Sequence, residues 1–138
     1  MVRVAKGQRG ASAVEFAVIT PLFVALLFAV VEFGMVLYAK GMITHAAREG
    51  ARYGVVYSTP RRDAVSIENE VKQYLNLSGL TNEATVTVSG AGGNTGDILD
   101  VKVTYNYEFM VLPKDINSYL AGTMPDLTLT AETVMRME

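Results

Sequence analysis

Gly10 and Glu15 are the residues whose types and spacing most directly suggest chemistry, because they stand at the head of a long apolar run. The segment from Phe16 to Val31 carries no charged residue. A carboxylate at the edge of such a segment is costly to desolvate and usually marks a functional position. If the peptide bond after Gly10 is cut, Ala11 gains a positively charged amine slightly more than one helical turn before Glu15.

This new amine and the Glu15 carboxylate could form an ion pair. Within one chain the pair would be a local contact. Between axially shifted neighbouring chains it could set the register of a helix bundle, because an unpaired charge is costly in an apolar environment. The alternative is an incidental glutamate that the dipole at a helix N-terminus favours. The spacing alone leaves both interpretations open.

Residues that would support catalysis are scarce. His45 is the only histidine and the chain has no cysteine, whereas zinc sites need three or four clustered ligands, commonly His and Cys. The glycine-rich stretch 92–97 lacks the lysine of a phosphate loop and the spaced acidic ligands of a calcium loop, so we interpret it as a flexible turn. The sequence predicts no enzyme activity, no catalytic residue, no metal site and no cofactor.

The element that must position these residues is a membrane-spanning helix. Residues 13–39 are apolar apart from Glu15 and Glu32, and about 20 apolar residues cross a hydrocarbon core. The two glutamates are 17 residues apart, about 25 Å along a helix, which suits positions near the two membrane edges. The flank 1–9 is basic and contains no acid, which favours a cytoplasmic N-terminus. Pro21 predicts a kink or a loosened turn.

Beyond the apolar run, the helix continues with small residues at i, i+4 spacing. Small residues let helix backbones approach closely. The partner is either another subunit or the chain's own folded domain, and the sequence leaves both alternatives open. The predicted packing residues are Ala46, Ala47, Gly50, Ala51 and Gly54, and the candidate intersubunit charges are Glu32, Arg48 and Arg52.

Residues 58–138 are expected to fold as an α+β domain behind the long helix of residues 11–57. Thr59 as N-cap and Pro60 at the first helical position predict a second helix from Arg61 to Leu77. Its apolar residues repeat at helical spacing, so this helix should bury one face.

Three later segments alternate between apolar and polar residues, as strands with one buried face do. The pattern predicts a small three-stranded antiparallel sheet with the short helix packed on it. From Val55 onward the chain has six basic and eleven acidic residues, a net charge of −5, which argues against a nucleic-acid surface. The strands are expected at 84–89, 99–109 and 127–136, with a longer connection at 111–126.

The first part of the chain resembles a known family. The motif GASAVEF at residues 10–16 resembles the prepilin-peptidase site of type IVb pilins and pseudopilins. The run RGASAVEFAVITPLFVALLFAVVEFG, with AAREGARYG after it, is similar to the TadE-like family of the tight-adherence (Flp) pilus system. The ending TAETVMRME is similar less specifically. Major Flp pilins have tyrosine where Phe16 stands and are much shorter, which favours a minor role.

The resemblance implies both processing and a role. Residues 1–10 would be a leader that a prepilin peptidase removes by cutting the bond between Gly10 and Ala11. Glu15 and Phe16 would act in assembly. The product would be a minor pilin or pseudopilin that assists or primes Flp pilus assembly, held in the bacterial inner membrane with its domain in the periplasm. Its partners would be TadF-like proteins, the major Flp pilin, the inner-membrane assembly platform and the lipid bilayer.

A second interpretation is an unprocessed single-pass membrane protein with an extracytoplasmic protein-binding domain. It explains the apolar helix and the sheet equally well. It does not explain the spacing between Gly10 and Glu15 or the short basic leader. A membrane-tethered enzyme would need a constellation of polar groups, and the sequence shows none.

Overall fold

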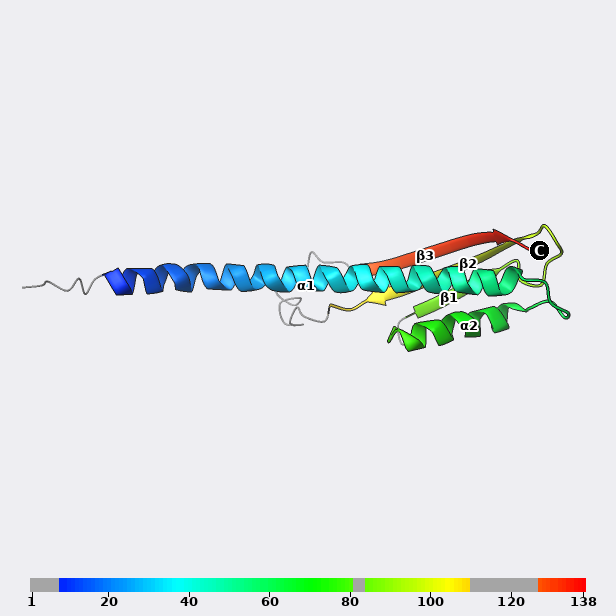
Figure 1. Cartoon of the computed structure of the whole chain (residues 1–138), viewed down its shortest axis with the longest axis horizontal. Helices are drawn as coiled ribbons and strands as arrows, with labels where there is room; N and C mark the ends of the chain where they lie inside the picture. Colours follow the sequence, from blue (N-terminus) through cyan, green and yellow to red (C-terminus); the bar gives the residue numbers. More distant parts are fainter. Residues whose placement is uncertain (1–7, 81–83, 110–126) are drawn as a thin grey trace, which may run out of the picture.

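The fold is a long helix whose C-terminal half carries a small α+β domain (Figure 1). The structure is a computed structural model that describes residues 8–80, 84–109 and 127–138. The predicted α+β class is confirmed. Most of the predicted leader and the connection at 111–126 lie outside the described residues. The elements are α1 (Gln8–Val55), α2 (Ala64–Leu77), β1 (Ala84–Ser89), β2 (Ile98–Tyr107) and β3 (Leu127–Arg136).

The first half of α1 touches nothing else in the described chain. Residues 10–31 are all exposed except Thr20, which is half-buried. This stretch is about 33 Å long at the helical rise, and α1 is long and apolar enough to cross a membrane. The helix is continuous through Pro21, and the Thr20 hydroxyl donates to the Phe16 carbonyl one turn earlier, at 2.7 Å.

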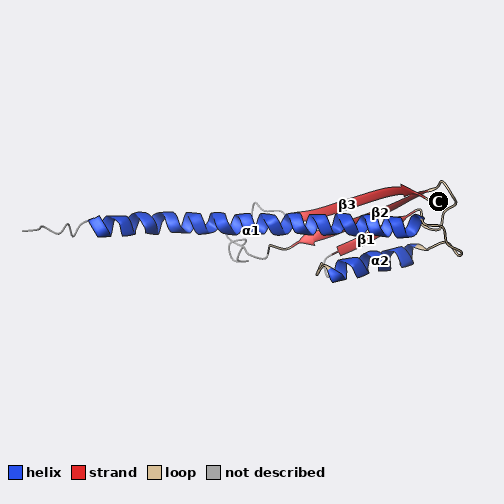
Figure 2. Cartoon of the chain, viewed as in Figure 1, coloured by secondary structure: helices blue, strands red, loops and turns tan. Residues whose placement is uncertain are grey.

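The second half of α1 buries one face against the domain. The three strands form an antiparallel sheet in the order β1-β2-β3, and its register places Thr104 opposite both Thr85 and Thr130. The two helices cover one face of this sheet, α1 over β2 and β3 and α2 beside β1 (Figure 2). The core comprises Ile43, Ala46, Ala47, Ala51, Val55, Ile67, Val71, Leu75, Leu99, Val101, Val103, Ala131 and Met137.

The small residues of α1 pack within the chain. A Cβ at Gly50 would lie 2.2 Å from Val71 Cγ2, and one at Gly54 would lie 2.5 Å from a Leu99 methyl carbon. Ala46, Ala47 and Ala51 are fully buried in the same core. The sequence left open whether these small residues pack on another subunit or on the chain's own domain. The structure shows them packed on the chain's own domain.

The second helix begins later than the sequence suggested. Its N-cap is Asp63, whose side chain accepts a hydrogen bond from the Ser66 amide at 3.0 Å, so the predicted start at Arg61 with Thr59 as cap is wrong. A hydrogen bond from the Ser66 hydroxyl, and after it the one from the Ser66 amide, lower the pKa of the Asp63 carboxyl and keep it a charged acceptor. The helix ends at Leu77, as predicted. The Leu80 amide donates back to the Leu75 carbonyl at 3.0 Å and closes this end.

The far end of the domain is closed by backbone hydrogen bonds that join three segments. In the β1–β2 hairpin, the Gly96 amide donates to the Met137 carbonyl at 2.9 Å, and the Met137 amide donates to the Asp97 carbonyl at 2.8 Å. The next residue, Glu138, donates its amide to the Val55 carbonyl at the end of α1, at 3.1 Å. The end of β3 is thereby fixed both to the hairpin and to the long helix.

Two matched glycine substitutions test the close packing of α1. Gly50→Ala would force Val71 to move, so we expect it to lower the free energy of unfolding by about 1–3 kcal/mol. Gly41→Ala meets no atom within 4 Å and should raise helix stability by about 1 kcal/mol. Thermal unfolding of the full chain in detergent micelles would measure both. Equal effects of the two variants would contradict the packing described here.

Candidate functional site

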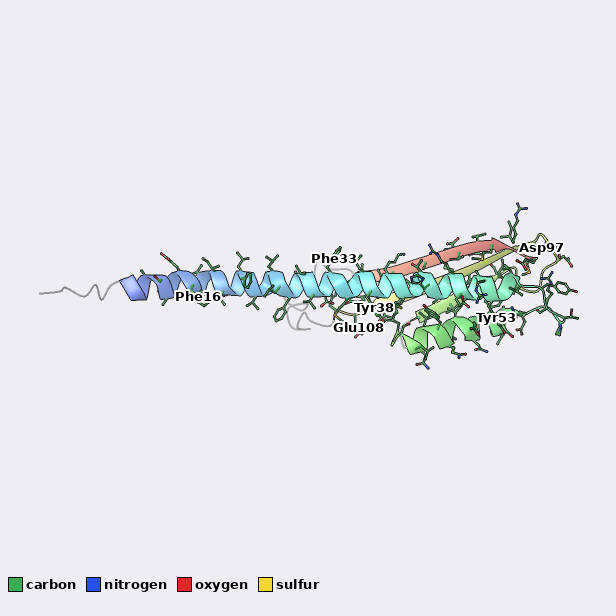
Figure 3. All side chains as sticks on the ribbon, in the orientation of Figure 1. Phe16, Phe33, Tyr38, Tyr53, Asp97 and Glu108 are labelled. Atoms are coloured by element: carbon green, nitrogen blue, oxygen red, sulfur yellow. The ribbon has the colours of Figure 1, made fainter. Side chains whose placement is uncertain are left out.

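The residues of the predicted cleavage and assembly site lie on the uncovered part of α1. The helix starts at Gln8, so the bond between Gly10 and Ala11 is already inside it. Glu15 is exposed, and no hydrogen bond or ion pair joins it to another residue of the described chain. Phe16 is 71% exposed and projects from the first turns of α1 (Figure 3). These side chains are free to meet groups from outside the chain.

Ala11 and Glu15 occupy the same face of the helix, since they are four residues apart on continuous α-helix. An amine created on Ala11 would therefore start within reach of the Glu15 carboxylate. The same exposure leaves Glu15 open to the amine of a neighbouring chain. The geometry of a single chain is compatible with an ion pair within the chain and with one between neighbouring chains.

Glu32 has a partner that the sequence did not reveal. It is only 4% exposed, and the Tyr107 hydroxyl at the end of β2 donates a hydrogen bond to its Oε1 at 2.7 Å. We predicted Glu32 as an intersubunit charge, whereas the structure places its carboxylate inside the chain, where α1 first meets the sheet. The two residues are 75 positions apart. The alternation of apolar and polar residues predicted that Tyr107 lies on the buried face of a strand, but it could not predict the contact with Glu32.

Tyr107 is held as a hydrogen-bond donor by its surroundings. Burial, followed by the hydrogen bond to Glu32, raises the pKa of the Tyr107 hydroxyl well above its ordinary value, which favours the protonated form that donates to Glu32. Its ring makes edge contacts with Tyr105 at 6.4 Å and with Phe109 at 5.7 Å between centroids. Tyr105 and Tyr107 belong to β2, whereas Phe109 follows its end. The predicted strand 99–109 therefore extended two residues too far at this end.

Arg48 and Arg52, the two arginines predicted as intersubunit charges, differ in their surroundings. The Arg52 Nε donates to Glu49 Oε2 at 3.0 Å within the same helix, and this pairing lowers the pKa of Glu49 and raises that of Arg52. Arg48 is exposed and forms no ion pair with any residue that the structure describes. Arg48 is therefore the candidate intersubunit charge left open to a contact outside the chain.

Comparison with known proteins adds one finding to this geometry. The family model described as TadE-like protein matches residues 10–52. Residues 10–52 are a TadE-like segment. No curated protein and no solved structure matches the chain. The match confirms, over this segment, the resemblance to the TadE-like family seen in the sequence.

The TadE-like segment occupies nearly all of α1 and none of the other elements. It begins at Gly10, includes the exposed apolar stretch and the small residues that pack on the domain except Gly54, and ends at Arg52. Glu32 lies inside the TadE-like segment, whereas its partner Tyr107 lies outside it. The family-specific part is thus the helix, and the domain supplies the surface on which half of that helix is packed.

Removing the Tyr107 hydroxyl tests the contact with Glu32. Tyr107→Phe keeps the ring but deprives a buried carboxylate of a donor, so we expect the free energy of unfolding to fall by about 1.5–3 kcal/mol. Denaturant unfolding of the full chain in detergent micelles would measure the loss. Tyr38→Phe is the matched control, because Tyr38 is 53% exposed. Equal stability of the two variants would show that the hydrogen bond contributes nothing measurable.

Proposed function

We propose that this chain is a TadE-like minor pilin or pseudopilin that assists or primes the assembly of Flp pili. The observation that carries the proposal is the family match over residues 10–52, which begins at the glycine where cleavage is expected. A prepilin peptidase removes residues 1–10, and the mature chain begins at Ala11. The chain acts as a subunit and as a peptidase substrate, with no catalytic activity and no cofactor of its own.

The assembly step depends on the two charges that processing brings together. Cleavage creates the Ala11 amine at the N-terminal end of an exposed apolar helix, and Glu15 supplies the complementary carboxylate. Glu15 has no partner within the described chain, which leaves it available to the amine of a neighbouring subunit. Because isolated charges are costly among apolar helices, this pairing favours one axial position of the incoming subunit over others.

The proposed location is the bacterial inner membrane, crossed once by α1, with the domain in the periplasm. The basic flank of the sequence supports a cytoplasmic N-terminus, and α1 has the length and composition to cross. The proposed partners are the prepilin peptidase, TadF-like proteins, the major Flp pilin and the assembly platform. Arg48, exposed beyond the apolar stretch, is a candidate contact with these neighbours.

Mass spectrometry of the chain purified from cells that make the peptidase tests the processing step. We expect the first residue to be Ala11, and we expect Gly10→Leu to retain the leader because a small residue no longer precedes the cut bond. The Gly41→Ala variant serves as a processed control. A wild-type chain that begins at Met1 in these cells would favour the alternative of an unprocessed single-pass protein.

Replacing the charge of Glu15 tests the assembly step. Glu15→Ala should leave membrane insertion and processing intact, because it makes the helix more apolar, and should strongly reduce the number of pili seen by electron microscopy. Glu132→Ala, the same change at an exposed position on β3, is the matched control and should leave piliation normal. Normal piliation in the Glu15 variant would remove this carboxylate from the mechanism.

A further inference from the structure

The surroundings of α1 change at Glu32. Up to Val31 the helix is exposed on all sides, and from Glu32 onward one face is covered by the domain. Apart from Glu32 itself, the apolar sequence continues across this level, through Phe33, Leu37 and Tyr38. Hydropathy alone therefore does not locate the membrane surface, whereas the onset of tertiary contact does.

The sheet limits how far the hydrocarbon can reach along α1. Tyr107 meets Glu32, so the neighbouring pair Asn106 and Thr128 lies close to the same level. Both of these residues are exposed, and the Thr128 hydroxyl donates to Asn106 Oδ1 at 3.2 Å. Open sheet edges do not occur in lipid hydrocarbon, because their backbone groups would go unsatisfied, and exposed polar side chains are costly there. The hydrocarbon must therefore end before this end of the sheet begins.

Helix length agrees with this limit. Residues 13–31 span about 28 Å at the helical rise, close to a hydrocarbon core of about 30 Å. The longer span of residues 13–39 would measure about 40 Å and would carry Ala39, which is 1% exposed against the domain, into the bilayer. The shorter span places Glu15 and Glu32 just inside one edge and just outside the other.

We propose that the membrane surface lies at Glu32 and that the base of the domain rests in the headgroup layer of the bilayer. Phe33 and Tyr38 are 63% and 53% exposed and project on different sides of α1 (Figure 3). Tyrosine is enriched in this interfacial layer because its ring is amphipathic, and Phe33 continues the apolar surface of the spanning part. The partner of this surface is a lipid bilayer, and the contact continues directly from the spanning part of the same helix.

The hydrogen bond between Glu32 and Tyr107 joins helix and sheet at this level. It attaches the end of β2 to the residue where the exposed run stops. The depth of the helix in the membrane and the height of the domain above it are thereby coupled. This inference concerns the membrane alone and holds whether or not residues 1–10 are removed.

Single-tryptophan variants test the proposal, because the chain contains no tryptophan. Phe23→Trp, Phe33→Trp, Tyr38→Trp and Tyr57→Trp would each be placed in the full chain and reconstituted into vesicles of phosphatidylcholine and phosphatidylglycerol. Lipids with a spin label at a shallow or a deep position of the acyl chain would quench the emission according to depth. Aqueous iodide would report exposure to water.

The expected order follows the structure. Tryptophan at position 23 should be quenched mainly by the deep label, and tryptophan at position 57 should be quenched by iodide alone. Positions 33 and 38 should prefer the shallow label, with emission maxima between those two extremes. Deep-label quenching at 38 equal to that at 23 would extend the hydrocarbon beyond Glu32. Iodide quenching at 33 and 38 equal to that at 57 would show a domain that stands clear of the membrane. Either result overturns the proposal.

Discussion

The domain depends on the close approach of α1 to the sheet and to α2. Gly50 and Gly54 present bare backbone to Val71 and Leu99. The neighbouring Ala46, Ala47 and Ala51 are fully buried. The core takes its residues from both helices, from β2 and β3, and from Met137 after β3. The last turns of the long helix complete that core, so the stalk and the domain are one folded unit.

The same helix serves two environments in succession, and its sequence shows the change. Where it is exposed on all sides, large apolar residues occur around its whole circumference, as lipid requires. Where it meets the domain, small residues occupy the buried face and charged residues the other. Glu32 stands at the transition, which explains how a carboxylate is accommodated within an apolar sequence: its partner is supplied by a strand far along the chain.

Local patterns predicted most of the fold. The alternation in the three strand segments identified the sheet, because a half-buried strand leaves a period of two in any context. The start of α2 was missed because Thr59-Pro60 and Asp63 both offer capping chemistry, and only the hydrogen bond from Ser66 decides between them. Small residues at i, i+4 spacing look the same whether the partner is internal or external. The contact between Glu32 and Tyr107 could not be predicted, since nothing local links two residues 75 positions apart.

The path of β3 beside α1 has a mechanical consequence. The Lys40 ammonium donates to the Thr130 carbonyl, and the Glu138 amide donates to the Val55 carbonyl. These two ties are about 22 Å apart along the helix and about 26 Å apart along the strand, so the two elements run side by side between them. A pull along the helix axis therefore loads the contacts between them in shear, which distributes the force over many contacts at once. The domain would follow the stalk as a rigid extension during axial movement.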